Sequence, residues 1–264
     1  MKEPFPIFSA ISIQTNSLCN LKCRFCFYGQ YDNYNSKVRI EDEHVYKMLD
    51  ELQAIEYRGR VSLYNMNEPL TDKRILAFLR YAKKSLPDCF HFFSTNGRLL
   101  TQPLLNEILP LVDQLRINNY GELRDLEDSD PKVDRRDKTH FFQQADSNRG
   151  GQLTGMAAAD RRGIGPCANP FGHLVVMPPG VAVLCCSDGF KQVQLGDIRR
   201  QSLSEIWHGE AYQTVRRALA NGDRRAIGLC RDCSIEGGGF FDYFLKPQEY
   251  RSIIEKFQRN EYQI

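Results

Sequence analysis

The chain has 264 residues, of which 42% are hydrophobic and 26% charged, and its formal net charge is +2, which suits a globular protein and gives no reason to expect a nucleic-acid partner. The first residues, MKEPFPIFSAISIQ, lack the apolar core of a signal peptide, and no stretch approaches the roughly 18 apolar residues that span a bilayer. We therefore expect a cytoplasmic protein that binds neither nucleic acid nor membrane.

The first half of the chain alternates strand-like with helix-like segments. Stretches rich in β-branched and aromatic residues predict strands at 8–15, 60–66, 89–95 and 113–118. Apolar residues at helical spacing predict helices at 41–57, 72–86 and 103–112. This order predicts an α/β fold whose parallel sheet is closed or partly closed into a barrel.

The second half of the chain has a different character. Residues 122–138 are highly charged and predict a solvated loop or helix surface, whereas HLVVMPPGVAVLCC (173–186) predicts a β-hairpin that turns at Pro-Pro-Gly. Residues 202–222 begin with a Ser-x-x-Glu capping signature and predict an amphipathic helix. We expect CRDC (230–233) in a loop and a last helix from about 247 to 260.

Nine cysteines are the most informative part of the composition. In a reducing compartment, clustered cysteines indicate metal or redox chemistry rather than structural disulfides. Seven of them form an early and a late group: Cys19, Cys23 and Cys26, then Cys167, Cys185, Cys230 and Cys233. Cys89 lies in an aromatic segment and is predicted to be a packed apolar residue, and Cys186 remains outside both groups.

Motifs with polar or cysteine side chains follow the predicted strands of the first half. The cysteine triplet follows the first strand, NEP (67–69) the second, STNG (94–97) the third, and Asn118 ends the fourth. Because ligands gather at the carboxyl ends of parallel strands, we expect these segments to share one rim.

The spacing Cys-x-x-x-Cys-x-x-Cys suits an iron–sulfur cube. Three thiolates from one loop can hold three irons and leave the fourth open to a small molecule. The alternative is a zinc loop that recruits a distant fourth ligand.

The segment CNLKCRFC, with aromatic Phe25 before the last cysteine, resembles the signature of the radical S-adenosylmethionine (SAM) superfamily. The resemblance implies a partial (β/α)6 TIM-like barrel and a 4Fe–4S cluster whose open iron chelates SAM. It also implies that an electron, supplied by a flavodoxin- or ferredoxin-type donor, cleaves SAM to a 5′-deoxyadenosyl radical. That radical removes a hydrogen atom from a substrate C–H bond.

The same resemblance implies a set of SAM contacts. Phe25 lies near the adenine, and Glu68 occupies the place of the acid that meets the methionine ammonium, a charge-assisted hydrogen bond. Asn67 stands where the family often has glycine, and Asn tolerates left-handed backbone best among the other residues. The implied contacts to the methionine carboxylate and ribose come from Ser94, Thr95, Asn96 and Asn118.

The late cysteines and their surroundings resemble the auxiliary-cluster extension called SPASM, in its shortened twitch form. The resemblance implies one further 4Fe–4S cluster held by Cys167, Cys185, Cys230 and Cys233. In that pattern a glycine stands five residues before the hairpin ligand, so Gly180 favours Cys185 over Cys186. A cluster with four thiolates has no open iron and is expected to carry electrons. A four-thiolate zinc site is the alternative.

The segment DSNRGG (146–151) resembles the corresponding segment of the 2-deoxy-scyllo-inosamine dehydrogenases, twitch enzymes of antibiotic biosynthesis. Carried over, the resemblance implies that Arg149 contacts an aminocyclitol substrate, and a surface turn is the alternative. The expected organisation is a radical SAM partial barrel at 1–150, a twitch domain (β-hairpin plus helix) at 151–236, and a C-terminal helix at 237–264.

The leading functional interpretation is oxidation of a secondary alcohol on an aminocyclitol or sugar, with one electron passing to the auxiliary cluster. The second is epimerisation of a similar substrate, with Cys186 as hydrogen-atom donor; otherwise Cys186 is a buried thiol of the hairpin. A peptide-modifying radical SAM enzyme and a zinc-stabilised binding module are the remaining alternatives.

Overall fold

The computed structural model describes residues 2–121, 126–127, 129–137, 148–155, 165–235 and 247–263. The chain divides into two compact units. We call one the parallel-sheet unit (12–145 and 177–180) and the other the C-terminal unit (1–11, 146–176 and 181–264). The three segments expected from the sequence, 1–150, 151–236 and 237–264, have boundaries that differ from those of the two units. This division of the chain stays a prediction.

The parallel-sheet unit contains the predicted alternation of strands and helices. Its strands lie in the order β6 (Val133–Asp137), β5 (Gln114–Asn119), β4 (Phe90–Thr95), β3 (Arg60–Ser62), with β2 (Ala10–Ile13) next to β3. The pairs β3–β4, β4–β5 and β5–β6 are all parallel. The α/β class with a parallel sheet is therefore confirmed.

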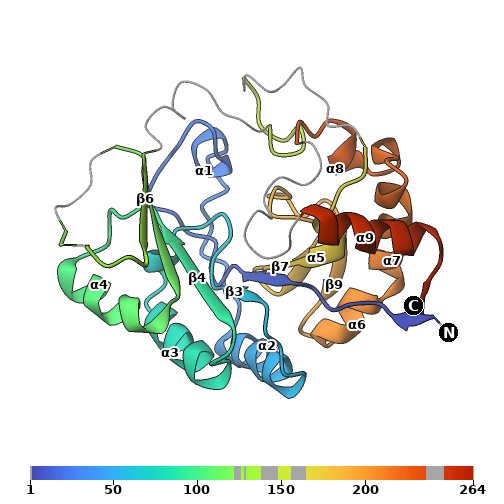
Figure 1. Ribbon diagram of the computed structural model, residues 1–264. Helices are drawn as coiled ribbons and strands as arrows, with labels where there is room; N and C mark the ends of the chain where they lie inside the picture. Colours follow the sequence, from blue (N-terminus) through green and yellow to red (C-terminus); the bar gives the residue numbers. More distant parts are fainter. Residues whose placement is uncertain are drawn as a thin grey trace. The chain divides into compact units, whose positions relative to one another are not determined.

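Three amphipathic helices cover the strands of this unit: α2 (Asp42–Ala54), α3 (Ile75–Ser85) and α4 (Gln102–Ile108). Figure 1 shows them beside one another along the sheet. The buried residues of α2 are Val45, Met48, Leu49 and Leu52, and those of α3 are Ile75, Phe78, Leu79 and Ala82. Because residues three and four apart lie on the same side of a helix, each of these helices buries one apolar face.

Strand β6 corrects the expectation for 122–138, since its residues were predicted as a solvated loop or helix surface. Its backbone pairs with β5, and Asp134 accepts hydrogen bonds from Arg116 at 2.9 Å and Arg136 at 3.0 Å. The strand lies at the end of the sheet order, where charged residues are common because an edge is exposed.

In the C-terminal unit, β7 (His173–Met177) and β8 (Val181–Val183) are neighbours joined by the predicted Pro-Pro-Gly turn, and β8 pairs antiparallel with β9 (Gln194–Asp197). The helix predicted at 202–222 is two helices, α6 (Leu203–His208) and α7 (Glu210–Ala220). The break falls at Gly209, whose extended backbone has φ −69° and ψ 160°. The predicted Ser202–Glu205 capping box is present.

The CRDC segment was expected in a loop, but Cys230 lies in a short helix, α8 (Gly228–Arg231). The last predicted helix is α9 (Pro247–Gln258). The remaining elements are α1 (Phe27–Gln30), α5 (Asn169–Gly172), β1 (Glu3–Pro4), β10 (Tyr262–Gln263) and the 3-10 turns Pro69–Thr71, Leu109–Leu111 and Arg224–Ala226. Within the described residues, the helices are all too short or too polar to cross a membrane.

Candidate cluster and cofactor sites

The early cysteines lie in one loop between β2 and α1, and hydrogen bonds hold this loop at both ends. The Cys26 amide donates to the Cys23 carbonyl at 2.9 Å, and Cys26 is the N-cap of α1. At the other end, Asn35 accepts from the Cys19 amide at 3.1 Å and donates to the Cys19 carbonyl at 3.0 Å. The backbone of the triplet is therefore constrained by contacts within the parallel-sheet unit.

Gly29 in α1 packs directly against this loop. A Cβ atom at Gly29 would lie 2.2 Å from the Cys23 carbonyl oxygen and 2.8 Å from that of Lys22. Only glycine lets the helix backbone come so close. Sequence reasoning missed this residue; the available signal was a glycine three residues after Cys26.

Glu68 joins the two motifs that were expected to share a rim. The Thr95 hydroxyl donates to Glu68 Oε1 at 2.6 Å, and the Asn96 amide donates to Oε2 at 2.7 Å. Oε1 also accepts from the Leu70 amide at 3.1 Å. A carboxylate oxygen accepts about two hydrogen bonds, so Oε2 keeps one acceptor position. Burial raises the pKa of Glu68 to about 6, and the three hydrogen bonds oppose that effect.

The other predicted SAM contacts lie around the same strand ends. Asn118 at the end of β5 donates to the Ser94 hydroxyl at 2.8 Å. Asn96 donates to the Asn20 side chain at 2.8 Å, which connects STNG to the cysteine loop. The Asn67 side chain holds its own turn, because its oxygen accepts from the Asn65 amide at 3.3 Å, and its amide donates to Asn16 at 2.9 Å. These contacts bring the predicted residues together, and their roles toward SAM stay predictions.

Phe25 lies against an aromatic residue that sequence reasoning did not select. Its ring centroid is 5.5 Å from that of Tyr120, and the two planes are tilted by 42°. Tyr120 directly follows β5, two residues after Asn118. The pair therefore brings an aromatic surface to the edge that also holds Asn118.

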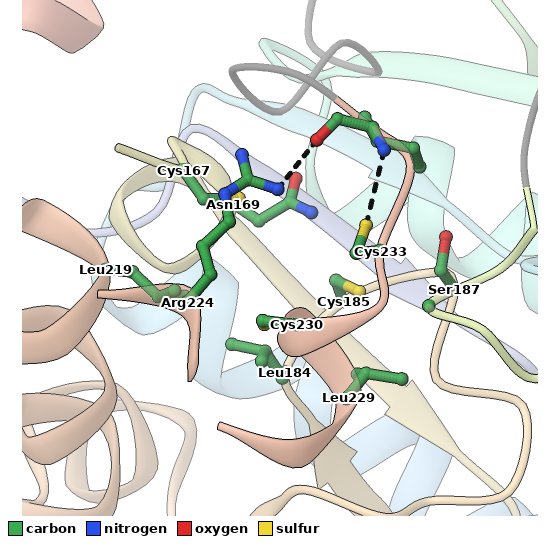
Figure 2. A pocket seen from close by; sticks show the side chains of 12 residues that line it. Cys167, Asn169, Leu184, Cys185, Ser187, Leu219, Arg224, Leu229, Cys230 and Cys233 are labelled. Atoms are coloured by element: carbon green, nitrogen blue, oxygen red, sulfur yellow. Dashed lines mark hydrogen bonds between the residues drawn. The ribbon is translucent and has the colours of Figure 1, made fainter. Parts of the chain in front are cut away.

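The late cysteines surround one cavity in the C-terminal unit. Its lining includes the thiols of Cys167, Cys185, Cys230 and Cys233 (Figure 2). Cys186 is not among the lining residues, although it directly follows Cys185. Cys89 lies elsewhere, buried in the parallel-sheet unit, where its thiol donates to the Tyr57 carbonyl at 3.0 Å, as expected for a packed residue.

The segment that carries Arg149 borders the same cavity. Gly150 is one of the lining residues, and a Cβ atom there would lie 2.5 Å from the Leu229 side chain. Arg149 itself has φ 50°, a left-handed conformation that is uncommon outside glycine. The residue that follows Arg149 in the chain therefore lines the four-thiol cavity, whereas Arg149 is not among the lining residues.

Two family models cover most of the chain. The model of the radical SAM superfamily matches residues 13–145, and the model described as an iron-sulfur cluster-binding domain (SPASM) matches residues 167–234. The chain belongs to the radical SAM superfamily. The SPASM match begins at Cys167 and ends just after Cys233, so it spans all four cavity cysteines.

Several known proteins resemble this radical SAM chain over nearly its full length. The S-adenosyl-L-methionine-dependent 2-deoxy-scyllo-inosamine dehydrogenase of Niallia circulans is 27% identical over 254 residues, which cover 90% of this chain and 99% of that protein. The crystal structure of BtrN in complex with AdoMet and 2-DOIA matches with a TM-score of 0.78 and 25% identity, covering 91% of this chain and 99% of that one.

Two further solved structures show the shared fold. BtrN in an open conformation matches with a TM-score of 0.68 and 22% identity, covering 87% of this chain and 94% of that one. Native anSMEcpe with bound AdoMet matches with a TM-score of 0.51 and 13% identity, covering 96% and 97%.

A radical SAM domain binds SAM and a 4Fe–4S cluster, and a SPASM domain binds further iron–sulfur clusters, so the residues present can be tested against both groups. Among the described residues, no group of three or more His, Cys, Asp or Glu is arranged to hold a single metal ion. The donor chemistry suits iron–sulfur clusters, since thiolates are their usual ligands.

Four of the cluster thiols, those of Cys19, Cys23, Cys185 and Cys230, would be protonated in the absence of iron. Burial raises the pKa of Cys19 and Cys23 to about 12, and repulsion from neighbouring thiolates adds to it. Burial likewise raises the pKa of Cys230 to about 12 and that of Cys185 well above its ordinary value. Cluster assembly at either site therefore has to displace protons.

Arg224 is a cavity residue that sequence reasoning missed. It is buried, and it donates to the carbonyls of Gly165 at 3.0 Å and Ile235 at 2.7 Å; Figure 2 shows the second bond. Its remaining terminal nitrogen, Nη2, is buried without a hydrogen-bond partner among the described residues. A free cationic donor beside four thiols fits a cluster, whose sulfurs accept hydrogen bonds. No sequence pattern marked this arginine among the 35 Lys and Arg residues.

Proposed function

We propose that this radical SAM enzyme oxidises a secondary alcohol of an aminocyclitol or a similar sugar to a ketone. The observation that carries the proposal is the shared position of two features: four thiols line one cavity, and Gly150, the neighbour of Arg149, lines it too. An electron-accepting site beside a candidate substrate residue is the arrangement that an oxidation requires. The alignment with 2-deoxy-scyllo-inosamine dehydrogenase along almost all of both chains supports the same reaction.

We propose that one group of residues binds the two clusters and SAM and that Arg149 orients the substrate. We assign the first cluster to Cys19, Cys23 and Cys26 and the auxiliary cluster to Cys167, Cys185, Cys230 and Cys233. The assigned SAM residues are Phe25, Asn67, Glu68, Ser94, Thr95, Asn96 and Asn118. When bound, these groups supply the radical that takes a hydrogen atom from the carbinol carbon and an acceptor for the remaining electron.

Arg149 is the proposed substrate residue. Its planar fork of N–H donors suits hydroxyl oxygens, and because a guanidinium offers donors and no acceptor, Arg149 orients the substrate and does not act as a base. Fixing the carbinol carbon toward the radical is the contribution expected of such a residue. The hydroxyl proton leaves to solvent, so the substrate loses two hydrogens in all. A flavodoxin- or ferredoxin-type protein is the proposed electron donor.

The test is anaerobic incubation of the reconstituted enzyme with SAM, a reductant and 2-deoxy-scyllo-inosamine in deuterium oxide, followed by mass spectrometry. We expect a product about two mass units lighter than the substrate, without deuterium at the reacting carbon, from wild type and from Cys186→Ala alike. A product of unchanged formula that gains deuterium and requires Cys186 would establish epimerisation instead, because a cysteine S–H exchanges with solvent.

A further inference from the structure

Residues 148–152 form a tight segment of unusual backbone conformation. Arg149, Gly150 and Gly151 have φ values of 50°, 69° and 76°, so three consecutive residues are left-handed. Such a conformation costs free energy at a non-glycine residue and persists only where the surroundings hold it. The contacts of the flanking residues, Asn148 and Gln152, show what holds it.

Asn148 attaches one end of the segment to the loop that follows α8. Its side-chain amide donates to the Asp232 carbonyl at 2.6 Å, and its side-chain oxygen accepts from the Ser234 amide at 3.0 Å. The Asn148 backbone amide donates to the Ser234 hydroxyl at 3.1 Å. Asp232 and Ser234 flank Cys233, and Asn148 is only 3% exposed. Three hydrogen bonds of this buried residue therefore tie the segment to one cysteine loop.

Gln152 attaches the other end to the loop after β8. Its side-chain oxygen accepts from the Gly189 amide at 3.1 Å, and its amide donates to Asp188 at 3.3 Å. Asp188 is fully buried and also accepts from the amides of Gln192 and Val193 at 2.8 Å. This loop contains Cys185, so the second attachment leads to another cluster cysteine.

Gly150 and Gly151 allow the segment to pack closely against α8 and the loop that follows it. A Cβ atom at Gly151 would lie 2.8 Å from the Asp232 side chain, and one at Gly150 would lie 2.9 Å from the Leu229 carbonyl oxygen. Neither position has room for a side chain against Leu229 or Asp232. The close packing of Gly150 and Gly151 on Leu229 and Asp232 gives the segment a second attachment to this loop besides the hydrogen bonds of Asn148.

We propose that Asn148 and Gln152 are positioning residues, which fix Arg149 to the two loops that carry Cys185 and Cys233. Binding of the auxiliary cluster orders these loops and thereby holds Arg149 in its substrate-binding conformation. Substrate affinity and auxiliary-cluster occupancy are then coupled, and the coupling is reciprocal. The inference rests on the proposed function for the role of Arg149.

One experiment is independent of the substrate. The amides of Gln152 and Leu153, which donate to the carbonyls of Arg149 and Asn148, report on the segment in hydrogen–deuterium exchange. In Cys233→Ala, which lacks the auxiliary cluster, we expect these amides to exchange at least about tenfold faster while those of α6 are unchanged. Unchanged exchange at Gln152 and Leu153, or equal acceleration in α6, would overturn the coupling.

The second experiment measures binding of 2-deoxy-scyllo-inosamine to the two-cluster enzyme, with SAM present and no reductant. We expect Asn148→Ala to keep its iron and to bind about tenfold more weakly, whereas the exposed control Asn221→Ala binds as wild type. Asn148→Asp, which keeps the acceptor and loses the donor, should lie between them.

A double-mutant cycle separates positioning from general destabilisation. If Asn148 acts through Arg149, then Asn148→Ala adds no further loss of affinity in an Arg149→Ala background. Additive losses, or wild-type affinity in an iron-replete Asn148→Ala, would refute the inference. If wild type does not bind the probe, the proposed substrate class fails, and the exchange experiment still decides whether the cluster orders the segment.

Discussion

Glu68 should make the affinity for SAM depend on pH. Burial raises the pKa of this carboxyl from 4.5 to about 6, although hydrogen bonds from Asn96, Thr95 and Leu70 oppose the increase. Under the proposed role, only the ionised carboxylate binds the methionine ammonium, through the acceptor position that Oε2 retains. The α-amino group of SAM, with an ordinary pKa of about 8, stays a cation below pH 7. The pH dependence in this range therefore comes from the protein.

The expected size follows from that pKa. With a pKa of about 6, Glu68 is ionised in roughly a quarter of the molecules at pH 5.5 and in about nine-tenths at pH 7.0. The dissociation constant of SAM should rise about fourfold over this fall in pH. In Glu68→Gln the dissociation constant of SAM should not change with pH in this range. At pH 7.0 it should be roughly 10- to 100-fold higher than that of wild type, since a hydrogen bond to a charged group contributes about 1.5–3 kcal/mol.

Glu68 changes the folding stability with pH in the direction opposite to that of a carboxylate whose pKa is lowered by folding. Because the pKa of Glu68 is raised in the folded state, its contribution to the free energy of unfolding is fully present below pH 4.5 and lost as pH rises through about 6. At pH 7 the buried charge costs about 2 kcal/mol. Glutamine removes that cost but turns an N–H toward the Asn96 amide, at about 1–3 kcal/mol. The free energy of unfolding of Glu68→Gln should therefore stay near that of wild type.

The assay is anaerobic calorimetric titration of SAM into enzyme with oxidised clusters, with iron measured on each sample. Glu43→Gln is the matched control, because Glu43 is exposed on α2. A wild-type constant that does not change between pH 5.5 and 7.0 would refute the role assigned to Glu68. Loss of iron in Glu68→Gln would mean that the residue supports the cluster loop instead.

The remaining predictions concern the two clusters. Gly29→Ala should lose the iron of the first cluster because its Cβ would lie 2.2 Å from a loop carbonyl, whereas Gly228→Ala, with nothing within 4 Å, should keep all of its iron; equal iron in both would contradict the packing argument. Arg224→Met should lower the reduction potential of the auxiliary cluster by tens of millivolts, since a buried cation beside the thiols is removed; an unchanged potential in a redox titration would exclude that role. Cys185→Ala should retain about half of the iron of wild type and Cys186→Ala all of it; the reverse result would make Cys186 the ligand.

The sequence predicted most of what forms the sheet and its functional edge. Segments with apolar residues at helical spacing became α2, α3 and α4, and the NEP and STNG motifs meet through the bonds of Glu68 to Thr95 and Asn96. These predictions succeed because burial imposes a period on the sequence and parallel strands end at one edge.

Strand β6 and the break at Gly209 were mispredicted because both depend on backbone contacts that leave no pattern in the sequence. Strand β6 reads VDRRD, which has no apolar alternation; it pairs with β5, and Asp134 is neutralised by Arg116 from that strand. The break at Gly209 depends on its close packing, since a Cβ there would lie 2.7 Å from the Glu205 carbonyl oxygen. Strand preference in particular depends on neighbours more than on the residues themselves.

The positioning residues were beyond sequence reasoning for a different reason. Cysteines could be found because thiols at such short spacing are typical of iron–sulfur ligands. Asn148 contacts a carbonyl and an amide 84 and 86 residues away, and every residue offers such groups, so its sequence carries no sign of its partner. The motif residues of this enzyme can therefore be found in the sequence, whereas positioning residues such as Asn148 are defined by backbone atoms of other loops. Substitution of such a buried amide should weaken substrate binding while the clusters stay in place, and only the folded structure identifies the residue.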